Sequence, residues 1–437
     1  MHTAESEPQI LHPANSGHRM RWNIAILLGI GVLINYFDRV NLSVAHTGLE
    51  HSFGINDVVY GYLLGAYNIP YAICQIPMGA LLDRFGIKPI GRIGAFLWSL
   101  ASFAAAAAAT VPIFYSARLL LGVGEAPFFP ANAKAIGRWF PPHRRSFATS
   151  FFDSAAKFSS AIGIPLIGII VLRFGWRSGF LFTGALSLAY FAAFYFIYRD
   201  PRPGETDHYV APVRHAASSS VRTTPTPHLG FFALLRQPKV LGLTIGFGAY
   251  NYVFYLLLTW LPSYFHQALH IDLFDSFFYT AIPWFIATIA DLLIGGLLVD
   301  MLIHRGLNSS RVRMVALVLG TLFGLGIFGA AFAHTRFAAV AWITLSITGL
   351  SVAAPVGWSL PSLIVPESNV GSVGGIVNFS NQISGICAPI ITGYVVHLTH
   401  SFAIAFYVAA VYLLIGIAAY LFLLRDTNMV PAASITQ

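Results

Sequence analysis

Seven ionisable side chains lie inside long apolar stretches of this sequence, where a charge is costly. A charged side chain at the centre of a membrane costs at least about 2.5–3.5 kcal/mol, so such residues usually face a cavity or a partner. Both acids and bases are present, and a cavity lined by both signs is what a carrier of protons and anions requires. The seven are Asp38, Arg39, Arg118, Glu125, Asp153, Lys157 and Asp291.

Asp38 and Arg39 are adjacent, so on a helix their side chains point about 100° apart. They cannot form a good pair with each other, and we expect each to find a partner on another helix. One interpretation is a fixed ion pair between helices. The other is that Asp38 takes up protons and Arg39 binds the substrate carboxylate, because a planar guanidinium matches a carboxylate with two parallel hydrogen bonds.

Arg118 and Glu125 are seven residues apart, which is two helical turns, so they share one helix face. Gly122 and Gly124 between them allow another helix or a ligand to come close. Glu125 has no basic residue within one turn, and a dry cavity would favour its neutral form, so it could carry a proton. The alternative is that Arg118 pairs with Asp38 and that Glu125 is structural.

Asp153 and Lys157 are spaced i,i+4, with the acid N-terminal to the base, which is the favourable order for a pair on one helix. They could simply neutralise each other. Lys157 could instead bind a second substrate carboxylate, which favours a dicarboxylate or an aromatic acid. Asp291 could also face Lys157, which would make both structural, and the sequence does not decide between these roles.

The elements that must position these residues are membrane helices. Of the 437 residues, 56% are hydrophobic and 10% are charged, and the mean hydropathy is +0.69, whereas a soluble domain carries roughly 25% charged residues. A spanning helix needs about 20 mostly apolar residues. We therefore predict an all-α membrane protein of twelve helices, over 22–45, 58–81, 89–109, 112–136, 146–172, 178–198, 240–266, 276–302, 312–333, 337–360, 371–396 and 402–424.

The one long polar stretch, rich in Pro, Ser, Thr and charge, divides the chain into two six-helix halves. A repeat supports the division: Gly79-x-x-x-Asp83 recurs 217 residues later as Gly296-x-x-x-Asp300, at the same place in each half. The predicted organisation is an N-terminal tail (1–21), a first half (22–198), a linker (199–238), a second half (239–424) and a C-terminal tail (425–437).

Lysine and arginine are distributed unevenly across the predicted membrane. Nineteen of the 25 lie on the side of the termini, three on the opposite side and three within spans. Positive residues favour the cytoplasmic side, so both termini are expected to be cytoplasmic and the number of spans even. This also explains the basic balance without any nucleic-acid partner, and the short loops favour a bacterial inner membrane.

The loop Gly79-x-x-x-Asp83-Arg84-x-Gly86-x-Lys88 resembles the signature loop of the major facilitator superfamily. The resemblance implies a fold of two pseudo-symmetric six-helix halves, with an acid that caps a helix end and pairs with basic residues across the cytoplasmic gate. The second copy, at Asp300, departs from the pattern because Met301 stands where a basic residue is usual.

Five further stretches resemble the anion:cation symporter branch of that superfamily. The resemblance implies proton-driven import of sugar acids or other carboxylates, with protonatable acids at Asp38 and Glu125, and with Arg39 and Arg118 handling the anion or holding the acids. The sequence departs from many relatives in having Asp153 where they have Asn. The stretches run over residues 35–43, 118–127, 260–262, 358–361 and 374–379.

Polar and aromatic residues within the spans could orient a ligand by hydrogen bonding or stacking. Most such residues in membrane helices serve packing or the interface. The strongest candidates for substrate contact are Tyr36, Trp358 and Asn378, the last because it lies in a matching motif. The others are Tyr67, Gln75, Asn251, Tyr255, Trp284 and Gln382.

Several functions lack a signal. The sequence contains no Gly-rich ATP loop, no Cys/His metal spacing and no serine nucleophile elbow. We therefore predict a monomeric secondary transporter of an organic anion, with protons and the bilayer as its other partners, and with no metal, cofactor or enzymatic activity. The alternatives are proton-coupled efflux of a metabolite or drug, which the buried arginines disfavour for a cation, and a membrane enzyme or sensor.

Overall fold

The structure is a computed structural model that describes residues 16–140, 142–202, 205 and 231–428. Within these ranges the regular structure is entirely helical. The helices before the linker are α1 (Ser16–Val44), α2 (His46–Phe53), α3 (Asp57–Ala66), α4 (Asn68–Phe85), α5 (Ile87–Ala107), α6 (Val111–Glu125), α7 (Phe128–Trp139), α8 (Pro142–Phe174) and α9 (Trp176–Ile197).

The helices after the linker include three π-helical segments, each of which continues an α-helix. In order they are α10 (Phe231–Leu235), α11 (Pro238–Ser263), η1 (Tyr264–Ala268), α12 (Leu273–Ala290), η2 (Asp291–Leu298), α13 (Val299–His304), α14 (Ser309–Gly324), α15 (Gly326–Ala330), α16 (Arg336–Ser359), α17 (Pro361–Ile364), α18 (Glu367–Thr399), α19 (Ala403–Ala419) and η3 (Tyr420–Leu424).

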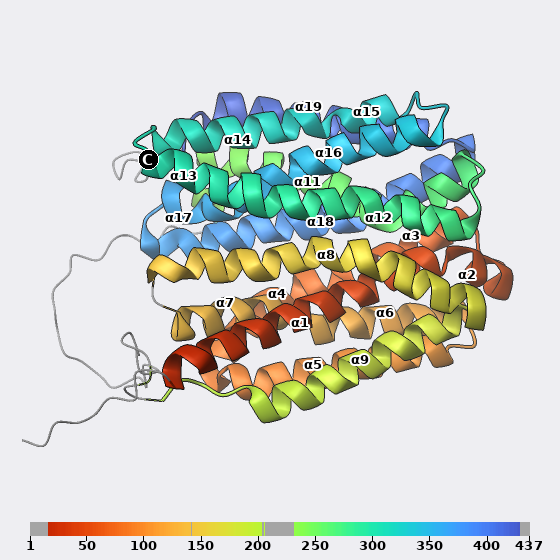
Figure 1. Cartoon of the computed structure of the whole chain (residues 1–437), viewed down its shortest axis with the longest axis horizontal. Helices are drawn as coiled ribbons and strands as arrows, with labels where there is room; N and C mark the ends of the chain where they lie inside the picture. The colour runs from red at the N-terminus through yellow and green to blue at the C-terminus, as the bar shows by residue number, and fades with distance from the viewer. Residues whose placement is uncertain (1–15, 141, 203–204, 206–230, 429–437) are drawn as a thin grey trace, which may run out of the picture.

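The two sets of helices form two side-by-side groups. In Figure 1, α1 to α9 (red to yellow) lie together below α11 to α19 (green to blue), and α1 begins at the same end of the molecule at which α19 and η3 end. We call this the termini end, and the end at which α2 lies the opposite end. A chain whose ends meet on one side of a bundle has crossed it an even number of times, as predicted.

Ten helices in the described part of the chain are long and apolar enough to cross a membrane. The predicted spans 58–81 and 112–136 do not form single helices, since α3 and α4 are separate, as are α6 and α7. Pro70 lacks the N–H that would bond to the carbonyl of Ala66, and Pro127 and Pro130 interrupt the ladder after α6 in the same way. The count of twelve spans stays a prediction.

The break between α3 and α4 faces α6. A Cβ added to Gly122 of α6 would lie 2.1 Å from the main-chain oxygen of Tyr67, the residue between α3 and α4. Only glycine permits this approach. The irregular backbone is thus enclosed by protein, which is where a membrane protein tolerates it.

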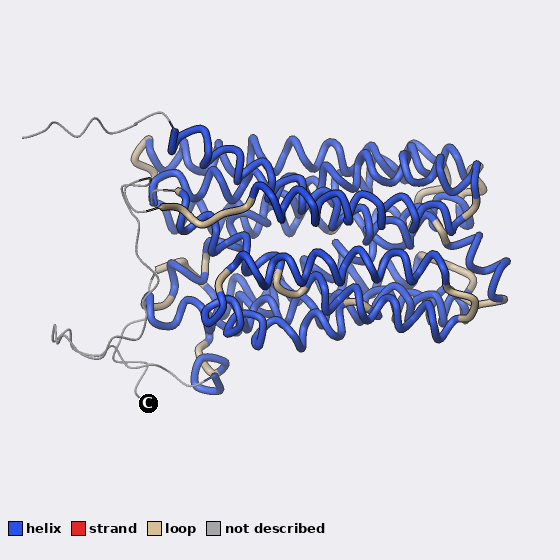
Figure 2. The backbone as a smooth tube through the Cα atoms, turned by 90° about the horizontal axis from the view of Figure 1, so that it is seen from below, coloured by secondary structure: helices blue, strands red, loops and turns tan. Residues whose placement is uncertain are grey.

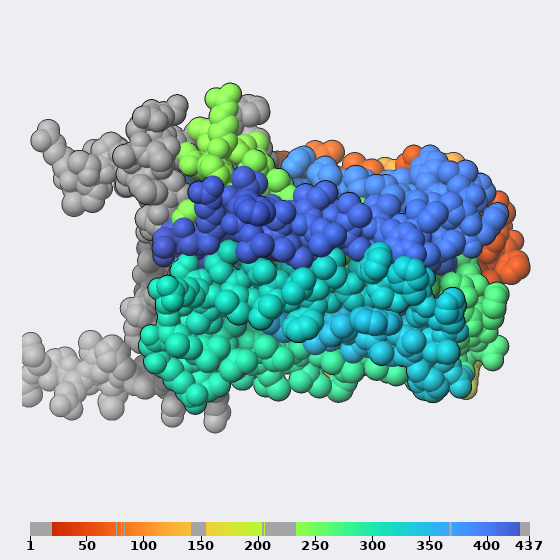
Figure 3. Space-filling view, turned by 90° about the horizontal axis from the view of Figure 1, so that it is seen from above, coloured from red at the N-terminus to blue at the C-terminus, as the bar shows by residue number. Residues whose placement is uncertain are grey.

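The two groups meet along the middle of the molecule in Figure 1, and Figure 2 shows from below that their long helices run side by side along its length. There α3 packs against α18, α8 against α12 and α1 against α11. The face shown in Figure 3 consists mainly of helices after residue 231, coloured green to blue. These helices expose large apolar side chains that a soluble surface would rarely carry so densely, among them Leu319, Phe323, Val411, Leu414 and Phe422.

We expect Gly122→Ala to destabilise the protein, because its new methyl group would overlap the main chain at Tyr67. Overpacking typically costs about 1–3 kcal/mol, so the thermal unfolding midpoint in detergent should fall. Gly371→Ala is the matched control, since no described atom lies within 4 Å of its added Cβ. Equal midpoints for the two variants would contradict the close approach.

Candidate functional site

The centre of the site is an ion pair between α1 and α6. Nη2 and Nε of Arg39 donate to one oxygen of Glu125, Oε2, at 3.0 and 3.3 Å. The two residues are 4% and 0% exposed. Because both bonds reach the same oxygen, the guanidinium does not grip the carboxylate with two parallel bonds. The hydrogen bonding between Glu125 and Arg39 is thus weaker than the two parallel bonds that a freely placed carboxylate could form with the guanidinium.

Aromatic rings surround the Arg39 guanidinium. Its central carbon lies 4.7 Å from the ring centre of Tyr36, 5.1 Å from that of Tyr67 and 5.6 Å from that of Tyr71. The break between α3 and α4 places Tyr67 and Tyr71 here, one on either side of Pro70. Cation–π contacts stabilise a desolvated charge without neutralising it, so the guanidinium keeps its ability to bind an anion.

Asp38 is held in a different way. Its carboxylate accepts hydrogen bonds from Trp98, from Ser102 at 2.7 Å and from Ser187 at 3.0 Å. Arg118 donates to the main-chain oxygen of Asp38 at 3.3 Å rather than to its carboxylate. The ion pair between these two side chains, which was the alternative interpretation, does not form. Three neutral donors stabilise an ionised carboxylate, but less firmly than a cation would.

The sequence did not single out Trp98, Ser102 or Ser187 as functional. Trp98 and Ser102 are spaced i,i+4 on α5, which places them on one face, and both are buried. That spacing does not predict Asp38 as their partner, since Asp38 is about 60 residues away in the sequence. Only the packing of α5 and α9 against α1 reveals it.

Lys157 of α8 forms an ion pair with Asp291, the first residue of η2. Both residues are 2% exposed, and the pair connects the two groups of helices. The structure therefore brings Lys157 to Asp291, one of the partners the sequence left open. The side chain of Asp153 lies outside the described part of the structure. A substrate contact for Lys157 stays a prediction.

The remaining predicted contacts are dispersed. Asn378 of α18 donates to the side-chain oxygen of Gln75 in α4, which links the two groups. Trp358 is 43% exposed and stands edge-on to Phe247, with ring centres 5.1 Å apart. Tyr36 is the ring closest to the Arg39 guanidinium. Of Tyr36, Trp358 and Asn378, only Tyr36 therefore lies at the central ion pair.

The predicted signature loop lies at the termini end, between α4 and α5. Gly86 has a φ of +85°, which glycine adopts without strain. Arg84, Lys88 and Asp300 of the second copy are exposed. Gly79 has no described atom within 4 Å of an added Cβ. The side chain of Asp83 lies outside the described structure, so its gate pairing stays a prediction.

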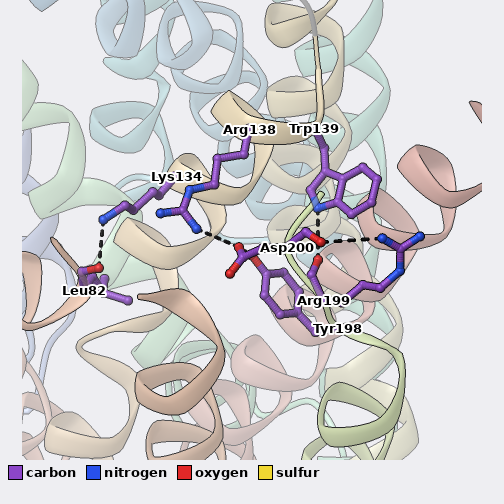
Figure 4. A network of polar contacts seen from close by, with 7 residues as sticks. All are labelled: Leu82, Lys134, Arg138, Trp139, Tyr198, Arg199 and Asp200. Atoms are coloured by element: carbon purple, nitrogen blue, oxygen red, sulfur yellow. Dashed lines mark hydrogen bonds and ion pairs between the residues drawn. The ribbon is translucent and has the colours of Figure 1, made fainter. Parts of the chain in front are cut away.

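A polar network beside this loop ties three helices of the first group together (Figure 4). Lys134 of α7 donates to the main-chain oxygen of Leu82 at 2.8 Å, near the end of α4. Arg138, one turn further on, forms an ion pair with Asp200 at 2.6 Å, just after α9. A lysine at a helix C-terminus satisfies its free carbonyls, so α4, α7 and the end of α9 are held as one unit.

Beyond α9, Arg199 pairs with Glu205. The hydrogen bonds from Arg199 lower the pKa of Glu205 to about 2, so this carboxylate stays ionised at any physiological pH. Among the described residues, no group of three or more His, Cys, Asp or Glu side chains could hold a metal ion.

Comparison with known proteins identifies the family. The sequence profile described as Major Facilitator Superfamily matches residues 28–389 and 308–436. An uncharacterized transporter of Bacillus subtilis (strain 168), YybO, is 36% identical over 95% of this chain and 96% of its own length. A probable L-galactonate transporter of Escherichia coli (strain K12) is 31% identical over 93% and 90%.

Solved structures agree in fold. A bacterial homologue of the human lysosomal transporter Spinster, inward-facing and unoccupied, has a TM-score of 0.72 at 17% identity, over 93% of this chain and 97% of that one. A D-xylose-proton symporter has a TM-score of 0.70 at 17% identity, over 92% and 97%. The protein is thus a multi-pass integral membrane transporter and not an enzyme, and the chain belongs to the major facilitator superfamily.

Proposed function

We propose that the protein imports an organic carboxylate together with protons, by alternating access between its two six-helix halves. The observation that carries the proposal is the buried ion pair between Arg39 and Glu125, with the guanidinium enclosed by tyrosine rings. A buried cation surrounded by aromatic rings can serve as a receptor for an anion. Glu125 occupies this receptor when no substrate is bound.

Coupling follows from competition for Arg39. A substrate carboxylate and the Glu125 carboxylate cannot both be satisfied by one guanidinium without leaving an excess negative charge in a buried site. A proton on Glu125 removes that charge and frees Arg39 to form two parallel bonds with the substrate. Binding of the anion therefore favours protonation of Glu125, and the reverse holds equally, because linkage is reciprocal.

Asp38 is the proposed second proton site. It adjoins Arg39 in sequence, and hydrogen-bond donors rather than a cation stabilise its charge. A substrate anion on Arg39 would repel this carboxylate, which favours its protonation. Arg118 donates to the Asp38 main chain and lies over the ring of Tyr67, with its central carbon 5.4 Å from the ring centre. It thus links the second acid to the tyrosines around Arg39.

The substrate class is supported by the relatives' names. They include transporters of L-galactonate, of galactarate and D-glucarate, and of D-galactonate. We infer a sugar acid or a related mono- or dicarboxylate. Lys157 would bind a second carboxylate only if Asp291 released it, so a diacid must compete with a buried counter-ion. The prediction of an aromatic acid has no support from these names.

We infer the orientation from the positive residues, which favour a cytoplasmic location for the termini end. Toward the opposite end the halves are in close contact, since Tyr62 and Tyr394 share a hydrogen bond of 3.2 Å between their hydroxyls. Nearer the central site, Asn68 donates to the main-chain oxygen of Gly385 at 2.9 Å. At the termini end, added Cβ atoms on Gly371, Gly374 and Gly375 of α18 meet no described atom within 4 Å. We infer a conformation closed to the outside.

The experiment that tests the proposal is uptake into proteoliposomes. A panel of galactonate, galactarate, glucarate and simpler mono- and dicarboxylates would be offered with and without an inward proton gradient. Gradient-stimulated uptake of one acid would support the proposal and name the substrate. Movement of a cation or neutral solute, with no carboxylate transported, would overturn the anion assignment and leave the fold unaffected.

We expect Arg39→Lys to reduce uptake of that acid by about 10–100-fold, because losing a charge-assisted hydrogen bond costs about 1.5–3 kcal/mol. Lysine keeps the positive charge but has no planar fork. Arg336→Lys, at an exposed arginine outside the site, is the matched control. Uptake by Arg39→Lys at the control rate would show that the guanidinium does not bind the substrate.

Glu125→Gln should separate exchange from accumulation. The neutral amide mimics the protonated acid, so substrate exchange across the membrane should persist while gradient-driven accumulation is lost. Counterflow of labelled substrate measures the first, and uptake under a proton gradient measures the second. Accumulation by Glu125→Gln equal to that of the wild type would exclude Glu125 as a coupling residue.

A further inference from the structure

A histidine lies buried where the two halves close at the opposite end. His46 is the first residue of α2, just after α1, and is 5% exposed. Within its own half, its imidazole stacks on Tyr60 of α3, with ring centres 3.7 Å apart and planes 6° apart. From the other half, the hydroxyl of Ser263 lies 2.8 Å from Nδ1, and Trp260 stands edge-on at 5.6 Å. The ring thus touches both halves at once.

The same region holds the other contacts that close this end. An added Cβ on Gly61 would lie 2.7 Å from the main-chain oxygen of Pro389. The indole N–H of Trp260 donates to that same oxygen at 3.2 Å. His46, Gly61 and Trp260 therefore form one packed seam, in which α2 and α3 of the first half meet α11 and α18 of the second. Separating the halves at this end would expose the imidazole to water.

The charged and titratable groups around His46 come from both halves. On its own side, Asp57 lies 3.6 Å from Nε2, and Glu50 and the Tyr60 hydroxyl are nearby. The other half contributes three histidines. His266 interacts electrostatically with His46, and His397 and His400 interact electrostatically with Asp57. Arg118, in the same half as His46, interacts electrostatically with Tyr60.

Burial decides the outcome of these influences. Loss of hydration, and secondarily the electrostatic influence of His266, lower the pKa of His46 to about 3. Asp57 attracts a proton to His46, but its side chain is 24% exposed and lies beyond hydrogen-bonding distance, so solvent weakens the attraction. In the closed seam the imidazole is neutral at any physiological pH.

We propose that His46 is a proton-binding site, separate from the central acids, through which acidity on the outer side opens this end of the transporter. When the seam parts, the ring is hydrated and accepts a proton, and the imidazolium cannot return to the apolar stack. The inference concerns the gate and goes beyond the proposed transport reaction, since it would hold for any substrate.

Linkage fixes the sign and size of the effect. The pKa of His46 is about 3 in the closed state and would return to its ordinary 6.5 in the open state. The closed state is therefore favoured above pH 6.5 and loses this advantage as the pH falls below it. Between pH 7.5 and 5.5 the ratio of open to closed molecules should rise about tenfold through this residue alone.

The test measures opening directly and needs no substrate. The two cysteines, Cys74 and Cys387, would be replaced by serine, and spin labels placed at His51→Cys and Ala268→Cys, exposed positions on the two halves at this end. Double electron–electron resonance in nanodiscs gives the open fraction from pH 4.5 to 8. The labels report the gate even if every transport assay fails, which separates this proposal from the previous one.

His46→Gln is the decisive variant, because glutamine can still meet the Ser263 hydroxyl but does not titrate in this range. Its open-to-closed ratio should lack the tenfold rise, so the wild-type ratio divided by the variant ratio isolates His46 from the central acids. His334→Gln, at a histidine in the loop before α16, should behave as the wild type. Identical pH curves for wild type and His46→Gln would overturn the proposal.

Ser263→Ala keeps the proposal testable if His46→Gln does not fold. It removes the hydrogen bond across the seam and leaves the imidazole in place. We expect a higher open fraction at every pH, by about 2–10-fold for one lost hydrogen bond, with the rise on acidification retained. A Ser263→Ala curve without that rise would contradict a proton on His46 as its cause.

Discussion

A charge buried in an apolar interior must be matched by an opposite charge or by hydrogen-bond donors, and this requirement organises the structure. Arg39 is matched by Glu125, Lys157 by Asp291, and Asp38 by the side chains of Trp98, Ser102 and Ser187. Each match joins two helices that are distant in sequence. Apolar helix surfaces gain little by leaving lipid for one another, because lipid tails are equally apolar. The polar contacts therefore decide which helices lie side by side.

The two buried ion pairs differ in which helices they join. The pair of Arg39 and Glu125 lies within one half and can exchange Glu125 for another carboxylate without moving the halves apart. The pair of Lys157 and Asp291 joins the halves, so releasing it involves the seam between them. This difference is the reason why we propose substrate exchange at the first pair, with the second pair as a barrier that a diacid would have to overcome.

Breaks in the helices position side chains around Arg39. The interruption at Tyr67 turns two tyrosine rings toward Arg39, and Gly122 of α6 fits against that interruption. The prolines that cause these breaks cost helix hydrogen bonds, yet the freed groups are enclosed by neighbouring helices. The same prolines explain why two predicted spans are divided, so the deviation from a simple twelve-helix pattern coincides with the functional centre.

The sequence by itself determined the membrane class, the helical content, the meeting of both chain ends on one side and the set of buried ionisable residues, because these follow from local hydropathy and from the cost of burying charge. It also placed Asp38 and Arg39 on different faces. Tertiary structure alone decided the partners: Glu125 for Arg39, donors from α5 and α9 for Asp38, and Ser263 for His46. These contacts span 60 to 217 residues, and no local pattern encodes which helices will pack together.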